Sequence, residues 1–284
     1  MKKTILITGA STGIGRSTAI ELARAGYEVL AGVRNEKDAE SLRNEGVADL
    51  KPLILDVTKS EDIARVALQL KKSLAENGLA ALINNAGINY VAPFEFADQA
   101  KVRNLMEVNF FGMMNLTRTL FPLLQKYHQQ TTDTAKVINI GSIGSKIGLP
   151  WEFSYHAAKF AVLGMSQSLR FEWEALGVKV TCVMPGGVKT PIFTKSGDDI
   201  RASKAVITGS NKAYYERNVS KMWDAAQQLE RFATEPQKVA QAIQRLIESR
   251  NPPLRKLVGL DAKIISTLVW LGCENLLKSQ FVSR

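Results

Sequence analysis

Short apolar runs alternate along the chain with longer stretches in which apolar residues recur every three or four positions. Runs that are apolar without a break, such as Ile5-Leu6-Ile7, indicate β-strands that are covered on both faces, as in a parallel sheet. This pattern predicts seven strands, at Thr4–Thr8, Val29–Val33, Leu53–Val57, Ala81–Asn84, Val137–Gly141, Lys179–Met184 and Lys256–Val258.

The stretches between these strands have helical periodicity. They predict helices at Ile14–Ala25, Glu61–Glu76, Gln99–Lys126, Ser154–Leu176 and Glu235–Ser249. Regular alternation of strand and helix favours βαβ units, and hence an α/β fold with a parallel sheet. With 284 residues, 45% of them hydrophobic, the chain is long enough for one doubly wound sheet. Because no repeat or linker divides it, we expect residues 1–284 to form a single domain.

Two regions interrupt the alternation. Residues 187–234 contain no strand pattern, and residues 260–284 form an amphipathic segment after the last predicted strand. Both follow strands whose carboxyl ends are expected to face the functional site. Because long excursions from a compact domain are usually functional, we expect a substrate lid at about 187–234 and a C-terminal extension at 260–284.

Charge and cysteine content narrow the function class. The net charge is +10, and residues 201–284 carry 14 Lys+Arg against 7 Asp+Glu, so +7 of the excess lies there. These basic residues are scattered singly, so nucleic acid binding is not expected. Two separated cysteines and two separated histidines offer neither a disulfide framework nor a metal site. The first apolar run is too short for a signal peptide, which favours a cytoplasmic protein.

A glycine-rich turn follows the first predicted strand and opens the first predicted helix. Gly9, Gly13 and Gly15 occur in the stretch TGASTGIG, which starts at Thr8. Glycine lets the chain turn sharply and bring its amides close to a pyrophosphate, and the positive end of the helix dipole adds to that attraction. The strand–turn–helix context favours dinucleotide binding over tight packing alone.

The residue at the end of the second predicted strand bears on the choice of cofactor. Enzymes that bind NAD usually place an acidic residue there to accept from the ribose 2′-hydroxyl. Here the strand ends at Val33, and Arg34 follows. A guanidinium would pair with a 2′-phosphate, so NADP(H) is favoured and NAD(H) stays possible. An arginine that merely faces solvent is the alternative.

A tyrosine and a lysine lie on one face of a predicted helix, because Tyr155 and Lys159 are four residues apart. A free phenol has a pKa of ~10, and a nearby ammonium would stabilise the phenolate and lower this pKa. Tyr155 could then take or give the proton of a hydroxyl group. Ser142 ends the fifth predicted strand and could hold the substrate oxygen.

In this order and with these spacings, the motifs resemble those of the short-chain dehydrogenase/reductase family over residues 3–190 and, more loosely, to Val258-Gly259. The overall pattern is most similar to the steroid and retinol dehydrogenase branch. The resemblance implies a Rossmann-type domain of about seven parallel strands with helices on both faces. It also implies an NAD(P)-dependent oxidoreductase that acts on CH–OH groups. The implied catalytic residues, two of which (Ser142 and Tyr155) also contact substrate, are Asn109, Ser142, Tyr155 and Lys159.

The resemblance assigns cofactor contacts as well. It implies that Asp56 accepts from the adenine amino group and that Asn85 lines the adenosine pocket. It further implies that the backbone of Val188 and the hydroxyl of Thr190 meet the nicotinamide carboxamide, while Asn109 holds a proton-relay water. Thr12, where many NADP-preferring members carry a basic residue, keeps NAD(H) open. The full cofactor-binding set is Gly9, Ser11, Thr12, Gly13, Ile14, Gly15, Arg34, Asp56, Val57, Asn85, Gly87, Tyr155, Lys159, Pro185, Gly186, Val188 and Thr190.

Apolar side chains in the lid and the extension suit a large apolar alcohol or ketone, such as a steroid, retinoid or fatty derivative. The alternatives are that they only pack the lid, that the enzyme is a 3-oxoacyl thioester reductase, or that the chain is a non-catalytic NADP-sensing binding protein. Predicted helices 99–126 and 154–176 pair subunits in many family members, which implies a homodimer or homotetramer. The apolar residues are Ile192, Phe193, Tyr214, Tyr215, Met222, Trp223, Ile264, Ile265, Leu268, Val269 and Trp270.

The C-terminal segment has a one-sided apolar stripe that includes Leu271 and Leu276, and basic residues such as Lys256 and Lys263 flank it. Its longest apolar run is too short for a membrane span, which needs ~20 residues. The segment could cover the substrate pocket, rest on a membrane surface as a peripheral contact, or pack on the sheet edge as a core helix.

Overall fold

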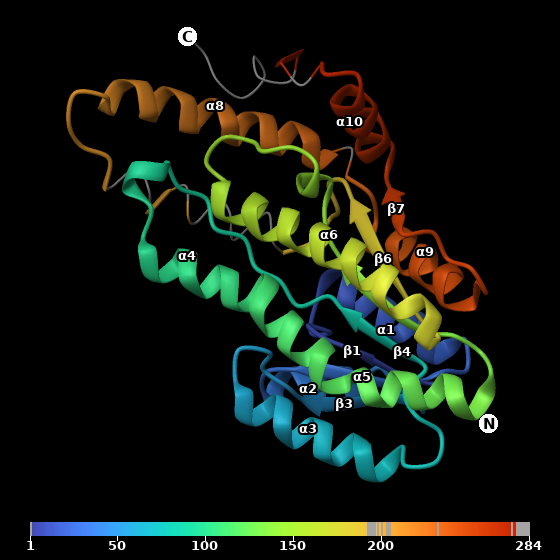
Figure 1. Ribbon diagram of the computed structural model, residues 1–284. Coiled ribbons are helices and arrows are strands. Elements are labelled where there is room, and N and C mark those ends of the chain that lie inside the picture. Colours follow the sequence, from blue (N-terminus) through green and yellow to red (C-terminus); the bar gives the residue numbers. More distant parts are fainter. Residues whose placement is uncertain are drawn as a thin grey trace.

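The computed structural model describes residues 2–191, 206–231 and 233–273, together with the single positions 197, 199, 201, 202, 275 and 276. A seven-stranded parallel sheet in the order β3-β2-β1-β4-β5-β6-β7 forms its centre (Figure 1), which confirms the predicted α/β fold. The order reverses between β1 and β4, and doubly wound sheets bind ligands beyond the carboxyl ends at such a point. The strands are β1 (Thr4–Ile7), β2 (Glu28–Val33), β3 (Leu50–Ile54), β4 (Ala81–Asn84), β5 (Ala135–Ile140), β6 (Val178–Pro185) and β7 (Arg255–Val258).

Helices cover both faces of the sheet, as predicted, and each face has its own apolar core. On one face α1 and α9 pack side by side with α2, and their apolar residues join those of β1 and β2. On the other face α5 packs on β4 and β5 with α3 beside it, and α6 packs on β6. These helices are α1 (Gly13–Arg24), α2 (Glu36–Arg43), α3 (Ser60–Ser73), α5 (Gly112–Thr131), α6 (Phe153–Trp173) and α9 (Pro236–Glu248).

Two elements near β3 differ from the sequence prediction. The strand begins at Leu50 rather than Leu53 and ends at Ile54, because its partner β2 ends at Val33, which pairs with Ile54. The proline within it is tolerated because β3 is an edge strand. Helix α2 was not predicted, since it is short and polar and buries only Ala39 and Leu42.

The helix predicted at 99–126 is three segments. An α-helix, α4 (Gln99–Met106), leads into a π-helical stretch (Glu107–Phe111), and α5 continues from Gly112. A Cβ on Gly112 would lie 2.4 Å from the Val57 carbonyl oxygen, so the chain after β3 approaches the helix closely here. Single π-helical turns of this kind are frequent at functional sites, and this one contains Asn109.

The two irregular regions contain helices α8 (Lys212–Arg231) and α10 (Leu260–Trp270), which lie toward the carboxyl ends of β6 and β7 (Figure 1). Val219 and Tyr215 of α8 pack against Val91, Leu149 and Trp151, which follow β4 and β5. The lid residues Ile192 and Phe193 lie outside the described residues, as do the side chains of Met222 and Trp223. Among the described helices, none is long and apolar enough to cross a membrane.

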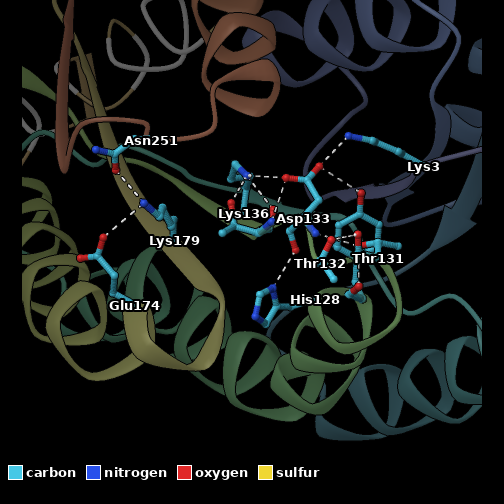
Figure 2. Close-up of polar contacts among 11 residues, drawn as sticks. Lys3, His128, Thr131, Thr132, Asp133, Lys136, Glu174, Lys179 and Asn251 are labelled. Atoms are coloured by element: carbon cyan, nitrogen blue, oxygen red, sulfur yellow. Dashed lines mark hydrogen bonds and ion pairs between the residues drawn. The ribbon is translucent and has the colours of Figure 1, made fainter.

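A polar cluster occupies the opposite, amino-terminal end of the sheet (Figure 2). Lys136, at the start of β5, is buried, and its ammonium donates to the carbonyl oxygen of Thr134 at 2.6 Å and to the Thr134 hydroxyl. Asp133 lies 4.0 Å from the same ammonium and forms a 2.8 Å ion pair with Lys3. The cluster ties the N-terminal segment to the turn before β5.

Candidate active site

The glycine-rich turn is held in place by the segment that follows β4. The side-chain amide of Asn85 donates to the carbonyl oxygens of Thr8 at 2.9 Å and Gly9 at 3.0 Å. In return the Thr8 hydroxyl accepts from the backbone N–H of Asn85 at 3.0 Å. The structure therefore brings Asn85 to the turn, where it fixes the path of the loop.

Backbone conformation and close contacts explain why glycine occupies positions 9, 13 and 15 of this turn. Gly9 and Gly13 have φ of +65° and +56°, in the left-handed region that glycine tolerates. A Cβ on Gly15 would lie 2.2 Å from the Gly9 carbonyl oxygen. The turn leads into the amino end of α1, whose first turn has no acidic residue. This cradle of backbone amides at a helix N-terminus fits a pyrophosphate, with Ser11 and Ile14 in the same turn.

Two predicted residues lie at the ends of β2 and β3. Arg34 is exposed directly after β2, and the glycine-rich turn bonds to this strand end through Ala10 N–H and Gly32 C=O at 2.9 Å. Asp56 lies beyond β3, where its Oδ1 accepts from the backbone N–H of Thr58 at 3.0 Å. Both lie at the carboxyl end of the sheet, where a dinucleotide's adenosine would bind next to the glycine-rich turn.

The loop after β6, residues 185–190, lies against the glycine-rich turn from the other side. A Cβ on Gly13 would be 2.9 Å from Thr190 Cγ2, so the two loops are in close contact. An isolated parallel bridge joins Val188 to Thr234, and it uses the C=O of Gly187 and the N–H of Lys189. The N–H and C=O of Val188 itself are thus directed away from Thr234.

Ser142, Tyr155 and Lys159 converge beyond the carboxyl end of β5. Ser142 follows the strand and begins a 3-10 turn (Ile143–Ser145), and its hydroxyl oxygen accepts from Gly144 N–H at 3.0 Å. Tyr155 and Lys159 come from the first turns of α6. The Lys159 ammonium donates to the carbonyl oxygen of Ile140 at 2.8 Å and lies 5.6 Å from the centre of the Tyr155 ring.

Asn109 and Gly87 border the same space. Both ends of the Asn109 amide bond the backbone of Ile88: Oδ1 accepts from its N–H at 2.8 Å, and Nδ2 donates to its C=O at 2.9 Å. A Cβ on Gly87 would lie 3.5 Å from Asn109 Oδ1 and 3.8 Å from Lys159 Nζ. The side chain of Asn109 is therefore engaged with the protein backbone, within the wall of the site.

A model of the family described as short chain dehydrogenase matches residues 3–201. The chain belongs to the short-chain dehydrogenase family. It is 34% identical over 256 residues to a 3-ketodihydrosphingosine reductase of Bacteroides thetaiotaomicron, covering 90% of this chain and 87% of that protein. It is 32% identical over 272 residues to human retinol dehydrogenase 16, with 93% and 82% covered. A short-chain dehydrogenase structure from Streptomyces avermitilis superposes with a TM-score of 0.79 at 28% identity, covering 98% and 96%.

The family membership confirms the resemblance seen in the motifs, including the retinol dehydrogenase branch. As a short-chain dehydrogenase the chain is an NAD(P)-dependent oxidoreductase. The glycine-rich cradle described above fits this dinucleotide.

The protonation of this short-chain dehydrogenase site differs from the expectation of a lowered tyrosine pKa. Burial raises the pKa of Tyr155 to about 12; a hydrogen bond with Ser142 opposes this, and the charge of Glu152 adds to it. Burial also lowers the pKa of Lys159 to about 8. Desolvation therefore outweighs any stabilisation of the phenolate by Lys159, and the Tyr155 hydroxyl keeps its proton at neutral pH.

Sequence reasoning missed several residues that support the site from distant parts of the chain. The Asp261 carboxylate of α10 accepts from the Gly187 N–H at 2.7 Å, and a Cβ on Gly186 would lie 2.0 Å from the same carboxylate. Lys146 donates to the Ser266 hydroxyl of α10 at 2.7 Å. Helix α10 thus braces both active-site loops, and no local signal in the sequence indicates these pairs.

Proposed function

We propose that the enzyme transfers a hydride between NADP(H) and a secondary alcohol or ketone with a large apolar substituent, and that Tyr155 is the acid/base. The observation that carries this proposal is the convergence of Tyr155, Ser142 and Lys159 beyond the carboxyl end of β5, at the same edge of the parallel sheet as the glycine-rich cradle. The cofactor cradle alone would suit a binding protein, whereas the cradle together with the three side chains suits proton transfer next to a nicotinamide.

The residues divide the work of carbonyl reduction. When bound, the reduced nicotinamide supplies a hydride to the carbonyl carbon. The electron pair that moves onto the carbonyl oxygen takes the proton of Tyr155, whose raised pKa of about 12 keeps this proton in place at neutral pH. Ser142 orients the oxygen through its hydroxyl proton, since its own oxygen accepts from Gly144. Charged Lys159 stabilises the phenolate that remains.

The preference for NADP(H) rests on the surroundings of Arg34. Nearby carboxylates are already paired: Glu36 forms a 2.5 Å ion pair with Arg43, and Asp38 accepts from the Asn35 amide at 3.0 Å. Arg34 itself is exposed beside the glycine-rich turn. Its guanidinium is therefore available for a 2′-phosphate, which supports NADP(H) over NAD(H).

The apolar character of the substrate is supported by two lines of observation. Aromatic side chains cluster over the end of the sheet, with Tyr215 of α8 in edge contact with Trp151 and Phe96, both at 5.5 Å. The two relatives described above are named for 3-ketodihydrosphingosine and retinol, both lipids. A hydrocarbon substituent would be bound by such a surface through burial of apolar area. The extent of the lid at 187–234 stays a prediction.

The exposed apolar surfaces suggest two further contacts. Phe111, Phe160 and Phe171, on the π-helical stretch and α6, are exposed by 39%, 46% and 78%, and we propose that they pair subunits into a homodimer or homotetramer. On α10, Leu260, Ile264, Trp270 and Leu271 are exposed while Ala262 and Ser266 are buried, so the helix is one-sided. With Lys256 and Lys263 nearby, the exposed side suits an anionic lipid surface, which would make the protein peripheral to a membrane.

A turnover screen tests the proposed function. NADPH and NADP are offered with a panel of steroid, retinoid and long-chain ketones and alcohols, with a 3-oxoacyl thioester included, and nicotinamide absorbance is followed. We expect turnover of an apolar ketone or alcohol and faster reduction than oxidation near neutral pH. Turnover of the thioester alone would favour the acyl reductase, and cofactor binding without any turnover would favour a sensing protein.

A further inference from the structure

His156 connects the helix that carries Tyr155 to the turn that carries Ser142. The side chain is only 6% exposed, and its Nδ1 lies 3.1 Å from the carbonyl oxygen of Gly144. Because a carbonyl oxygen can only accept, Nδ1 carries the proton. The N–H of the same glycine donates to the Ser142 hydroxyl oxygen at 3.0 Å. Gly144 is thus held by His156 on one side and holds Ser142 on the other.

The packing at this point leaves little freedom. A Cβ on Gly144 would lie 2.7 Å from His156 Nδ1 and 3.3 Å from Ser142 Oγ, so the histidine ring and the serine hydroxyl close around the glycine. The Ser142 N–H also donates to the Ser145 hydroxyl at 3.2 Å, which completes a compact turn. A shift of the ring would therefore be passed to Ser142 through the backbone of this turn.

Glu152 faces the other nitrogen of the ring. Its Oε2 lies 3.8 Å from His156 Nε2, and its Oε1 accepts from the Asn89 amide at 2.6 Å. Asn89 follows Ile88, whose backbone is bonded on both sides by Asn109. His156 Nε2 is buried and, among the described residues, has no hydrogen-bond partner. At 3.8 Å the carboxylate makes no hydrogen bond with Nε2, so the hydrogen bond from Nδ1 to the Gly144 carbonyl oxygen is what fixes the orientation of the ring.

We propose that His156 is a positioning residue for Ser142, acting through Gly144. This inference rests on the proposed reaction, in which Ser142 orients the substrate oxygen. Displacing a reacting group by ~1 Å can reduce a rate by about a hundredfold, so a turn fixed from two sides has a direct consequence for catalysis. Neither His156 nor Glu152 contacts the substrate in this proposal.

Two replacements separate the roles of the ring nitrogens. The amide nitrogen of asparagine occupies nearly the position of His Nδ1, whereas that of glutamine occupies nearly the position of Nε2. His156→Asn therefore keeps the donor to Gly144, and His156→Gln removes it. His156→Leu fills the space without any donor. Steady-state kinetics on a ketone substrate, cofactor binding by fluorescence and thermal unfolding are measured for all three variants.

We expect kcat to fall by about tenfold to a hundredfold in His156→Gln and His156→Leu, with NADPH affinity unchanged within about twofold. His156→Asn should recover most of the lost kcat. Equal losses in the asparagine and glutamine variants, or kcat near that of the parent in both, would overturn the positioning role. This pair decides the matter even if the leucine variant does not fold.

Tyr155→Phe, run alongside, keeps this inference separate from the proposed function. If that variant retains the parent rate, the tyrosine mechanism itself fails, whatever the His156 variants do. If it loses the rate while His156→Gln and His156→Asn behave alike, the mechanism stands and only the positioning role of His156 is wrong.

Discussion

Two buried lysines lie at opposite ends of β5 and differ in what surrounds them. Lys136 is the second residue of the strand, and Lys159 donates to the carbonyl oxygen of Ile140, where the strand ends. Burial lowers the pKa of both to about 8. The difference lies in their partners: Lys136 has Thr134, which accepts twice, and Asp133 at 4.0 Å, whereas Lys159 has one hydrogen-bond acceptor among the described residues.

This difference separates a structural lysine from one that is available to a ligand. An ammonium has three N–H donors, and two of those of Lys136 meet acceptors on Thr134. Lys159 lies over the ring of Tyr155 and keeps donors that, in the proposed reaction, serve the Tyr155 phenolate and the dinucleotide. A shifted pKa would mark both residues as functional candidates, so the number of satisfied donors is the better guide here.

The largest expected effect comes from replacing each of the two lysines with methionine. Lys159→Met should reduce kcat/KM by about 10²–10⁴-fold, since it removes the charge that stabilises the Tyr155 phenolate. Lys136→Met, a buried change of the same kind, should leave kcat/KM within about twofold of the parent because the sites are far apart and share no partners. Assays of both variants on one substrate check this. Similar losses in the two would show that the difference in partners has no functional meaning.

The comparison extends to a third cation, Arg34, which makes no hydrogen bond or ion pair with the residues that the structure describes. Arg34→Ala should weaken NADPH binding by about ten- to a hundredfold and NADH binding much less, because one charge-assisted phosphate contact is worth ~1.5–3 kcal/mol. Dissociation constants for both cofactors measure this.

Arg43 provides the matched control for that experiment, since it ends α2, the helix that follows Arg34, but is already paired with Glu36. Arg43→Ala should change the ratio of NADPH to NADH affinity little. A parent enzyme that binds both cofactors equally would contradict the assignment of Arg34 to the 2′-phosphate.

The smallest expected effect concerns stability at the amino end of the sheet. Below pH ~8 Lys136 is charged in both the folded and the unfolded protein, so burying the charge opposes folding in full. This cost fades as the pH rises from about 8, the pKa in the folded protein, to 10.5, the pKa in the unfolded chain. Lys136→Met should therefore stabilise the protein by about 1 kcal/mol at pH 7, and by less near pH 10. Denaturant unfolding at the two pH values measures this. A difference that grows with pH would contradict the sign of the shift.

Much of the site could be predicted because it consists of local motifs. Two motifs are short enough for local structure to fix their geometry: the strand–turn–helix at Gly9–Gly15 and the helical pair Tyr155 and Lys159. The parallel sheet follows from the alternation of strands and helices. These features need no knowledge of which distant segments meet.

The parts that could not be predicted depend on tertiary contacts. Asp261 accepts from Gly187 across 74 positions of sequence, and nothing around either residue indicates the pairing. His156 hydrogen-bonds to Gly144, in the turn that follows Ser142, and its place next to Tyr155 in the sequence does not indicate this contact. The direction of the Tyr155 pKa depends on how deeply the folded chain buries its hydroxyl, which the spacing to Lys159 does not specify.

The central claim, that Tyr155 is the acid/base of a nicotinamide-dependent reaction, is tested most directly by Tyr155→Phe. The change removes one hydroxyl and leaves the ring in place. We predict that kcat/KM falls by at least about 10²–10⁴-fold while NADPH still binds with parental affinity, because the cofactor is held mainly by the two loops. A rate within about tenfold of the parent would contradict the account.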